Sequence, residues 1–438
     1  MPPSAEEAAR LTELDAAIAA NPDDAQAYQD RGGLLRGLGR AADALEDYRR
    51  CAFLVPDDRK RRFNVGLALL DLHRPQEALT WIRQAADDLQ PYLPAWTGVG
   101  EALLRMGEAQ EAISWFDRVL ALEPDNVQAR LGRAVAQLSL GNFREGWLGF
   151  EVRLQDSRMG TWRPRPPPDG IARPPWRGDV DVRGRTLLVT AEQGLGDSIM
   201  MARYLPLLRA GGARVVLQLQ RHLPPLMQGM ADHIGLLGDV PPDYDMHVPM
   251  MSLPRAFQTV LETIPADVPY LHINPALLGV QPRPRIGLAW AGNPLHALDG
   301  LRSTSFTALL PLITRVDADF HVLHLPVAAE ERAMIDRHRN VIMHPEDRDL
   351  LATAALIAAM DLVISVDTSI AHLAGALARP VWLMLPGGTT DFRWLRGRAD
   401  SPWYPTMRIF RQPRLGDWAA LMEDVLRAWE QGALGGMP

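Results

Sequence analysis

Residues 363–386 read VISVDTSIAHLAGALARPVWLMLP, and this stretch decides the fold of the second half of the chain. Its apolar opening, which ends at Ser365, has the length and composition of a strand that is buried on both faces. A helix is expected over residues 370–377, and a second strand over residues 381–385. Two strands joined through a helix form a parallel pair, so the stretch predicts a doubly wound α/β sheet.

The same alternation recurs on the N-terminal side of this stretch. It begins with a strand over residues 186–190 and begins again with a strand over residues 285–290, while residues 239–261 are expected to hold loops and one short helix. We therefore predict two Rossmann-like units, an N-terminal half over residues 183–280 and a C-terminal half over residues 281–438. Ligands bind beyond the carboxyl ends of the strands in such sheets, which directs attention to four loops: 191–197, 291–303, 366–369 and 386–393.

The first third of the chain is instead a repeat array. Three columns of residues recur at a spacing of 34 positions: Gly32, Gly66, Gly100 and Ala134; Ala44, Ala78, Ala112 and Gly146; and Tyr48, Ile82, Phe116 and Phe150. The small residues let two helices approach closely, and the bulky residues fill the gap to the next pair, which resembles the tetratricopeptide repeat. Residues 1–157 are expected to form this α-solenoid, with a capping helix near residues 6–20 and repeats that begin near Ala25, Arg59, Leu93 and Val127.

Stacked repeats of this kind present a concave groove that suits a polypeptide partner. In the usual geometry of the repeat, the first helix of each repeat supplies the groove side chains, here Phe63, Leu67, Leu70, Leu104 and Leu131, with Val135 and Leu138. The alternative is that several of these side chains pack between helices, and the sequence leaves both possibilities open.

A proline-rich bridge over residues 158–182 joins the repeats to the α/β region. Its prolines exclude a helix and favour extended backbone. A solvated linker is one possibility. A strap packed on the next domain is favoured, because Trp162 and Trp176 would be costly to leave in water.

Composition excludes several classes of function. The chain has 438 residues and a formal net charge of −7, which argues against a nucleic-acid partner. Its single cysteine, Cys51, excludes an intrachain disulfide and a cysteine-rich zinc site, and no metal or prosthetic group is expected. No stretch approaches the ~18 apolar residues of a membrane helix. The N-terminus lacks a signal-peptide pattern, so no membrane insertion and a cytoplasmic location are expected.

The loop of residues 191–197 carries the first candidate for chemistry. Gln193, Gly194 and Gly196 belong to a glycine-rich turn whose backbone can approach a ligand at a helix start. Asp197 follows it, and could serve either as a general base or as the cap of the following helix. The residues alone favour the cap.

A second candidate lies where the buried strand ends. Asp367, Thr368 and Ser369 crowd the first turn of a helix, and His372 lies one turn further on. Hydroxyls, free N–H groups and the helix dipole together would make a seat for a diphosphate. A capped helix with a packed histidine explains the pattern equally well.

Two further loops contain residues suited to phosphate or sugar. Arg302 and Ser303 lie on the loop that follows Trp290-Ala-Gly-Asn-Pro294, and Gly387 and Gly388 lie on the loop that continues to Asp391 and Arg393. A solvated surface loop is the alternative for the first of these two loops.

Four segments together resemble one protein family. They are AEQGLGDSIMMARYLP (191–206), WAGNP (290–294), residues 363–386 and SPWYPTMRIFRQ (401–412). They look like the bacterial tetratricopeptide-repeat glycosyltransferase proteins, whose catalytic half is similar to the family 9 heptosyltransferases and has the GT-B fold of the O-GlcNAc transferases. The resemblance covers nearly the whole chain. Some members glycosylate flagellin, which their repeats recognise.

The resemblance implies roles for residues that match the family motifs. Asp197 would act as the base at the acceptor, next to the acceptor-side loop. The helix start, with His372, would bind donor phosphate. The donor-side residues implicated by the resemblance and by the loops above are Trp290, Gly292, Asn293, Pro294, Arg302, Ser303, Asp367, Thr368, Ser369, Gly387 and Gly388.

The chain also departs from the family pattern. Relatives often continue the donor-side loop as H-x-N-D-R-x-R-S, whereas this chain has Leu298 and Gly300 in place of the asparagine and the first arginine. The lysine that binds donor phosphate in heptosyltransferases has no counterpart, since Lys60 is the only lysine. Arg302 is the candidate substitute.

The sequence therefore predicts a tetratricopeptide α-solenoid followed by a metal-independent GT-B glycosyltransferase. The donor would be a CMP-, UDP- or ADP-linked sugar, and the acceptor a serine or threonine hydroxyl of a flagellin-like protein held by the repeats. A heptosyltransferase-like enzyme acting on lipopolysaccharide or another glycan is the first alternative. A non-catalytic scaffold is the second, and the altered loop of residues 296–303 is its only support.

Overall fold

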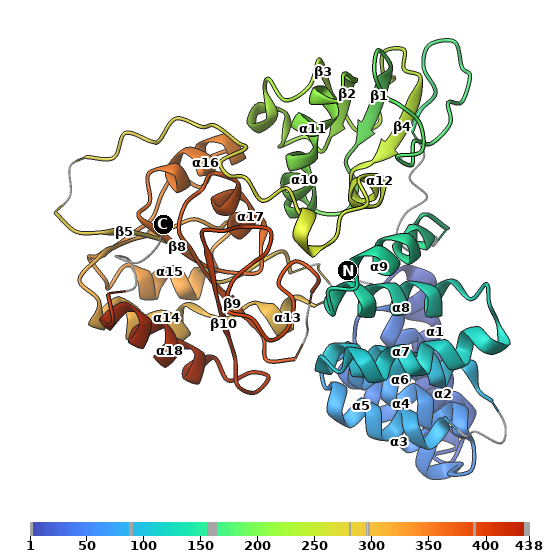
Figure 1. Cartoon of the computed structure of the whole chain (residues 1–438). Helices are drawn as coiled ribbons and strands as arrows, with labels where there is room; N and C mark the ends of the chain where they lie inside the picture. Colours follow the sequence, from blue (N-terminus) through green and yellow to red (C-terminus); the bar gives the residue numbers. More distant parts are fainter. Residues whose placement is uncertain are drawn as a thin grey trace. The chain divides into compact units, whose positions relative to one another are not determined.

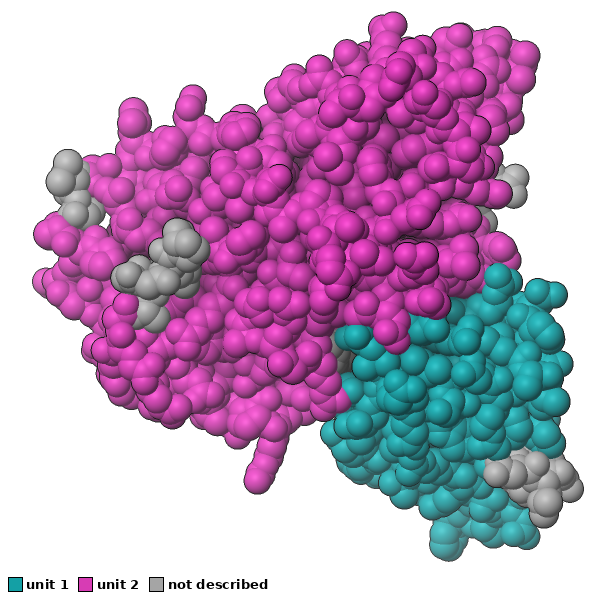
Figure 2. All heavy atoms as spheres, viewed as in Figure 1, with its two compact units in different colours: residues 1–140, 388–390 teal, residues 141–387, 391–438 magenta. Residues whose placement is uncertain are grey.

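The computed structural model describes residues 3–86, 91–155, 164–279, 282–294, 296, 298–388 and 391–432. The chain divides into two compact units, which Figure 2 colours separately. Unit 1 comprises residues 1–140 and 388–390, and unit 2 comprises residues 141–387 and 391–438.

Unit 1 is built of paired helices, drawn from blue to teal in Figure 1. They are α1 (Ala5–Ala20), α2 (Ala25–Gly37), α3 (Ala41–Leu54), α4 (Arg59–Asp71), α5 (Pro75–Ala85), α6 (Leu93–Met106), α7 (Ala109–Leu122) and α8 (Val127–Ser139). The first helix of each repeat begins at the predicted residue. Asp24, Asp58 and Asn126, which share one position of the repeat, cap these helices by accepting backbone N–H groups of the first turn. The prediction of four repeats behind a capping helix is confirmed.

Glycine in the repeat is required by packing. A Cβ added at Gly66 would lie 2.2 Å from Cγ1 of Ile82, and one added at Gly100 would lie 2.6 Å from the Phe116 ring. The small and bulky columns of the sequence therefore meet directly inside each helix pair.

The residues predicted to line a partner groove differ in burial. Phe63, Leu70 and Leu138 are buried, and Phe63 packs edge-on against Tyr92 with ring centroids 5.5 Å apart. This burial favours the alternative that these three side chains pack between helices. The remaining predicted groove residues are half-buried: Leu67, Leu104, Leu131 and Val135.

The first sheet of unit 2 has four parallel strands in the order β3-β2-β1-β4. The strands are β1 (Thr186–Thr190), β2 (Arg214–Leu219), β3 (His233–Leu236) and β4 (Met246–Pro249). β4 lies in residues 239–261, where the sequence predicted loops and one short helix; the short helix is present at Leu253–Ala256, but the strand was not predicted. The strand is short and ends in proline, and it is defined by its pairing with β1.

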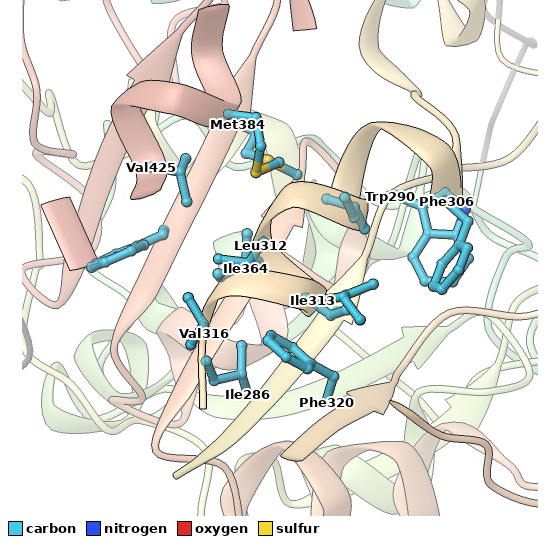
Figure 3. Packing of buried hydrophobic residues seen from close by; sticks show 14 of the residues in the cluster. Ile286, Trp290, Phe306, Leu312, Ile313, Val316, Phe320, Ile364, Met384 and Val425 are labelled. Carbon is cyan, nitrogen blue, oxygen red and sulfur yellow. The ribbon is translucent and has the colours of Figure 1, made fainter. Parts of the chain in front are cut away.

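The second sheet has six parallel strands in the order β10-β9-β8-β5-β6-β7. They are β5 (Arg285–Ala289), β6 (Asp319–Val322), β7 (Val341–Ile342), β8 (Leu362–Val366), β9 (Val381–Leu385) and β10 (Met407–Arg411). Figure 3 shows the hydrophobic cluster of this sheet, in which Ile286 of β5, Ile364 of β8 and Met384 of β9 pack with Leu312 of the covering helix α14. The predicted parallel α/β architecture is confirmed, and both sheets belong to the same compact unit.

The helices of unit 2 connect these strands. They are α9 (Phe143–Phe150), α10 (Leu195–Met201), α11 (Leu205–Ala210), α12 (Leu253–Ala256), α13 (Asp299–Arg302), α14 (Phe306–Arg315), α15 (Ala329–Ile335), α16 (Leu350–Ala358), α17 (Ser369–Ala376) and α18 (Trp418–Glu430), with a 3₁₀ helix η1 (Glu151–Gln155) after α9.

Helix α9 belongs to the α/β unit even though its sequence continues the fourth repeat. Trp147 packs edge-on against Phe392 at 4.9 Å, and Phe143 lies 6.0 Å from Trp403. These aromatic contacts place the division of the chain before Gly141, ahead of the predicted boundary at residue 157.

The proline-rich bridge is packed where it is described. Pro175 forms a parallel bridge with His247 of β4, and the Trp176 N–H donates to the His247 carbonyl at 2.7 Å. Trp176 is buried and its indole N–H donates to the Val180 carbonyl. The strap interpretation therefore holds for these residues, while Trp162 lies outside the described part of the chain.

None of the helices in the described ranges combines the length and the apolar character that crossing a bilayer requires.

Candidate functional site

Strand order identifies where each sheet can hold a ligand. In the first sheet, β1 lies between β2 and β4, and in the second sheet, β5 lies between β6 and β8. On either side of β1 and of β5, the strand order runs in opposite directions. The loops that follow the carboxyl ends of the strands diverge there and leave room for a ligand. The loops predicted to carry chemistry after β1, β5 and β8 lie at these two reversals.

Asp197 is held at the start of α10. Its Oδ2 accepts the N–H of Gly194 at 2.8 Å, so the side chain reaches back over the glycine-rich turn. Asp197 is therefore in the third position of the helix, and not the cap residue that one prediction allowed. Gln193 holds a left-handed backbone conformation, with φ of 61°. Its carbonyl accepts from the Gln220 side chain, which fixes the turn.

The other oxygen of Asp197 binds an arginine of the C-terminal half. Arg393 Nη2 donates to Asp197 Oδ1, while Arg393 Nη1 donates to both carboxylate oxygens of Asp391 at 2.7 Å. The guanidinium group stacks over the Phe392 ring at 4.2 Å, and the Arg393 side chain is only 11% exposed. This ion pair joins the acceptor-side loop to the loop that follows β9.

The helix start after β8 matches the predicted geometry. Thr368 caps α17 by accepting the Ile370 N–H, and Ser369 is the first residue of the helix. Burial raises the pKa of the Asp367 carboxyl, the Asp391 carboxylate adds to the rise, and Arg393 opposes it. Asp367 therefore lies in the electrostatic field of the same arginine that binds Asp197.

His372 lies between the two halves of unit 2. A Cβ added at Gly196 would lie 2.7 Å from His372 Cδ2 and 3.3 Å from Nε2, so the glycine of the acceptor-side loop lets this ring approach. On its other edge, Nδ1 lies 2.9 Å from the hydroxyl of Tyr404. Burial lowers the pKa of His372 far below its ordinary value, and Arg393, Arg203 and Arg302 lower it further.

Burial keeps both groups of this pair in their neutral forms. The imidazole is neutral, and burial raises the pKa of Tyr404 so that its hydroxyl keeps its proton. A neutral ring that accepts the Tyr404 proton at Nδ1 carries its own proton on Nε2, the nitrogen nearer to Gly196. His372 can then donate one hydrogen bond without carrying a positive charge.

The donor-side loop after β5 is folded on itself. Gly292 N–H donates to the Ser303 hydroxyl, which donates to Asp299 Oδ1 at 2.9 Å. Arg302 Nε donates to the same oxygen at 3.3 Å, and a Cβ added at Gly292 would lie 2.8 Å from Arg302 Nη2. Arg302 thereby lies close enough to lower the pKa of His372 and to oppose the rise in the pKa of Asp367.

Trp290 and Gly387 are both closely packed against other parts of the C-terminal half. Trp290 is 0% exposed, donates from its indole N–H to Glu331, and packs in the core of the second sheet. Gly387 packs against the backbone of residues 412–415, where a Cβ would lie 2.8 Å from the Gln412 carbonyl oxygen. The Trp290 side chain therefore has no surface open to a ligand, and the close approach of residues 412–415 explains why position 387 is a glycine.

The other predicted donor-side residues differ in placement. Asn293 and Pro294 are exposed. Gly388 is grouped with unit 1, so no place in this site is assigned to it.

Two arginines at the site escaped prediction as site residues. In the sequence, Arg393 could be identified only as an arginine that follows Asp391 in a loop, with nothing to indicate a role. Arg203 is buried in the N-terminal half and donates to the carbonyls of Trp403 and Pro265 and to the Tyr270 hydroxyl. Neither contact has a local sequence signal, because each joins residues far apart in the chain.

A buried ion cluster supports the acceptor-side loop from behind. Arg153 of η1 is 1% exposed and donates to both oxygens of Glu192, at 3.0 and 2.7 Å. It also donates to Glu151 and Ser252. Glu192 precedes Gln193, so this cluster anchors the turn that presents Asp197.

Buried histidines at the end of β6 make unit 2 sensitive to acid. Burial lowers the pKa of His321 and of His324 to about 4. The unfolded chain takes up protons at these residues as the pH falls below 6.5, whereas the folded unit does not, so stability is lost with falling pH. We expect about 2 kcal/mol of loss per histidine between pH 6.5 and 5. Calorimetric melts of wild type and His324→Phe across this range check it; equal slopes for the two proteins would contradict it.

Within the described residues, no group of three or more histidine, cysteine, aspartate or glutamate side chains is arranged to hold a metal ion.

Comparison with known proteins gives matches for both parts of the chain. Residues 329–411 match the sequence model described as glycosyltransferase family 9 (heptosyltransferase), and residues 11–59, 30–94 and 103–146 match tetratricopeptide repeat models. The first of these segments contains Asp367, His372, Asp391 and Arg393. The chain thus carries tetratricopeptide repeats and a glycosyltransferase family 9 segment, which indicates a glycosyltransferase.

The chain is also similar to individual proteins. Protein FlbA of Caulobacter vibrioides is 28% identical over 454 residues, which cover 95% of this chain and 68% of FlbA. Among solved structures, YrrB, described as a TPR protein with an unusual peptide-binding site, matches at 19% identity with a TM-score of 0.31, over 34% of this chain and 77% of YrrB. PilW, a type IV pilus biogenesis factor, matches at 21% identity with a TM-score of 0.31, over 33% of this chain and 67% of PilW.

Proposed function

We propose that the protein is a metal-independent, GT-B-type glycosyltransferase that moves a sugar from a nucleotide sugar to a serine or threonine hydroxyl of a flagellin-like protein. One observation carries the proposal. Asp197, on the loop after β1, is bound by a residue of the family 9 segment, so the candidate acceptor base and the candidate donor residues form one site. The tetratricopeptide repeats supply the surface for a protein acceptor.

The chemistry follows from the positions of these groups. The acceptor hydroxyl oxygen bonds to the anomeric carbon of the sugar while Asp197 takes its proton. The bond from that carbon to the phosphate oxygen breaks, and its electron pair stays on the phosphate. The first amides of α17, the hydroxyl groups of Thr368 and Ser369, and Arg302 stabilise the charge that develops there. His372 contributes a neutral hydrogen bond from Nε2.

The donor requirement is consistent with the family match. Glycosyltransferases of this kind use a nucleotide sugar, and no prosthetic group is proposed. The cytoplasm, where nucleotide sugars are made, is the location that we propose. The donor that we propose is a sugar linked to CMP, UDP or ADP.

Binding of nucleotides tests the donor half of the proposal. Thermal shifts are measured with CMP, CDP, UDP, ADP and GDP on wild type and on His372→Ala. We expect one nucleotide to raise the melting temperature of wild type. The shift should be smaller in His372→Ala, because this variant lacks the imidazole N–H that would donate a hydrogen bond to the phosphate. Absence of any shift would contradict the donor site.

Transfer to an acceptor tests the other half. Unmodified flagellin and lipopolysaccharide are each incubated with the sugar conjugate of the nucleotide that binds, and products are weighed by mass spectrometry. A flagellin mass increased by one sugar supports the proposal. Modification of lipopolysaccharide alone would instead support the alternative of a heptosyltransferase-like enzyme that acts on a glycan, which the match to family 9 also allows.

A further inference from the structure

The base assigned above is occupied in the structure. Asp197 accepts from the Gly194 N–H with one oxygen and from Arg393 with the other. Each oxygen of the carboxylate thus already faces a hydrogen-bond donor of the protein. An acceptor hydroxyl can therefore reach Oδ1 of Asp197 only when Arg393 has moved its hydrogen bond elsewhere.

Arg393 is surrounded by more negative charge than it can balance. Burial acts to lower its pKa, but Asp391, Asp197 and Asp367 outweigh burial and raise it. Asp391 is bound through both oxygens and lies only two residues away, so this pair moves as part of one loop. The bond to Asp197 joins residues 196 positions apart, one from each half of unit 2.

We propose that Arg393 is shared between Asp197 and the donor phosphate, so that binding of the donor draws the guanidinium group off Asp197 and frees the base. This inference rests on the proposed function and deepens it. Negative charge leaves Asp197 when the acceptor proton arrives, and negative charge appears on the phosphate when the sugar bond breaks. A single cation between the two positions stabilises the charge at both stages of the reaction.

The position of Arg393 fits this exchange. Its pair with Asp391 and its stacking on Phe392 hold the base of the loop. Trp394, the next residue, packs against the His372 ring of α17, the helix proposed to bind phosphate, with ring centroids 5.2 Å apart. The segment that carries Arg393 therefore contacts both Asp197 and this helix. Arg393 is also a second candidate cation, in addition to Arg302, in a region of the chain that has no lysine.

A double-mutant cycle on anion binding tests the exchange. The dissociation constant of pyrophosphate, a probe without a base, is measured by calorimetry for wild type, Asp197→Asn, Arg393→Gln and the double variant. We expect Asp197→Asn to tighten pyrophosphate binding about 3- to 10-fold, because Arg393 then has no ion pair with residue 197 to break before it binds the anion. Arg393→Gln should weaken binding about 10- to 100-fold, as expected for a charge-assisted hydrogen bond. In the Arg393→Gln background, Asp197→Asn should no longer tighten it.

The chain offers a matched control. Arg398 binds both oxygens of Asp400, two residues away on the same segment, at 2.8 and 2.6 Å, but no residue of the N-terminal half is among its described partners. Arg398→Gln should leave pyrophosphate affinity unchanged. Arg393→Lys, which keeps the charge, serves as the second variant in case Arg393→Gln does not fold, and should retain part of the affinity.

The outcomes separate this inference from the proposed function. An unchanged affinity in Asp197→Asn, or in Arg393→Gln, would overturn the inference even if wild type transfers sugar. Failure of wild type to bind pyrophosphate would also overturn it. The expected cycle together with absent transfer to either acceptor would support the shared arginine and contradict the proposed function.

Discussion

Asp197→Asn should lower the rate of sugar transfer about 10²- to 10⁴-fold, the range that a general base contributes. Asparagine keeps the shape of the side chain and its oxygen can still accept the Gly194 N–H, so the turn before α10 is retained. What is lost is the ability to take the acceptor proton. The rate is measured under saturating donor, where the loss must appear in kcat rather than in KM, because donor and acceptor remain bound.

The control for this variant is another helix-bound aspartate in the same unit. Asp417 caps α18 by accepting the Ala420 N–H at 3.1 Å, and its change to asparagine should leave transfer unchanged. Binding of the protein acceptor to the repeats should be the same in both variants. Full transfer by Asp197→Asn would show that Asp197 is not the base.

Arg153→Met should destabilise unit 2 by about 3–5 kcal/mol, the cost of leaving a buried partner charge unpaired. Glu192 is only 10% exposed and would keep the Met251 N–H as its remaining described hydrogen-bond donor. Methionine fills a similar length without polar atoms, so the effect reports on the lost charge. A calorimetric melt should show the transition of unit 2 several degrees lower.

The matched variant for this prediction is Arg315→Met. Arg315 also binds two glutamates, Glu423 and Glu430, but its side chain is 47% exposed. Pairs in water contribute about 0–1 kcal/mol, so little change is expected. Adding Glu192→Gln to Arg153→Met should recover part of the loss. A melting temperature for Arg153→Met equal to that of Arg315→Met would contradict the prediction.

Features that repeat or that follow a strand could be predicted from the sequence. The 34-residue columns located the first helix of each repeat at the residue where it begins, because capping and packing positions recur together. The loops after β1, β5 and β8 were identified because buried apolar runs and glycines mark where parallel strands end. Strands with weak patterns, such as β4, and the aromatic docking of α9 depend on partners elsewhere in the chain.

Contacts between the two halves of unit 2 could not be predicted in the same way. The pair of Asp197 and Arg393 depends on how two sheets face one another, and no local pattern encodes that arrangement. The burial of Phe63 could not be predicted for a related reason. An apolar residue on the first helix of a repeat is equally suited to a groove and to the interior of the stack, and the bend between helices decides which.

The docking of α9 has a consequence for how such chains can diversify. The last helix of the repeat pattern, α9, packs against Phe392 and Trp403. The α/β unit therefore includes the terminal helix of the repeats as part of its own structure. Whole helix pairs can be gained or lost ahead of Gly141 without disturbing those aromatic contacts. Recombination at that point would exchange the preceding repeats as a set, whereas a crossover at residue 157 would separate this helix from the α/β unit that it packs against.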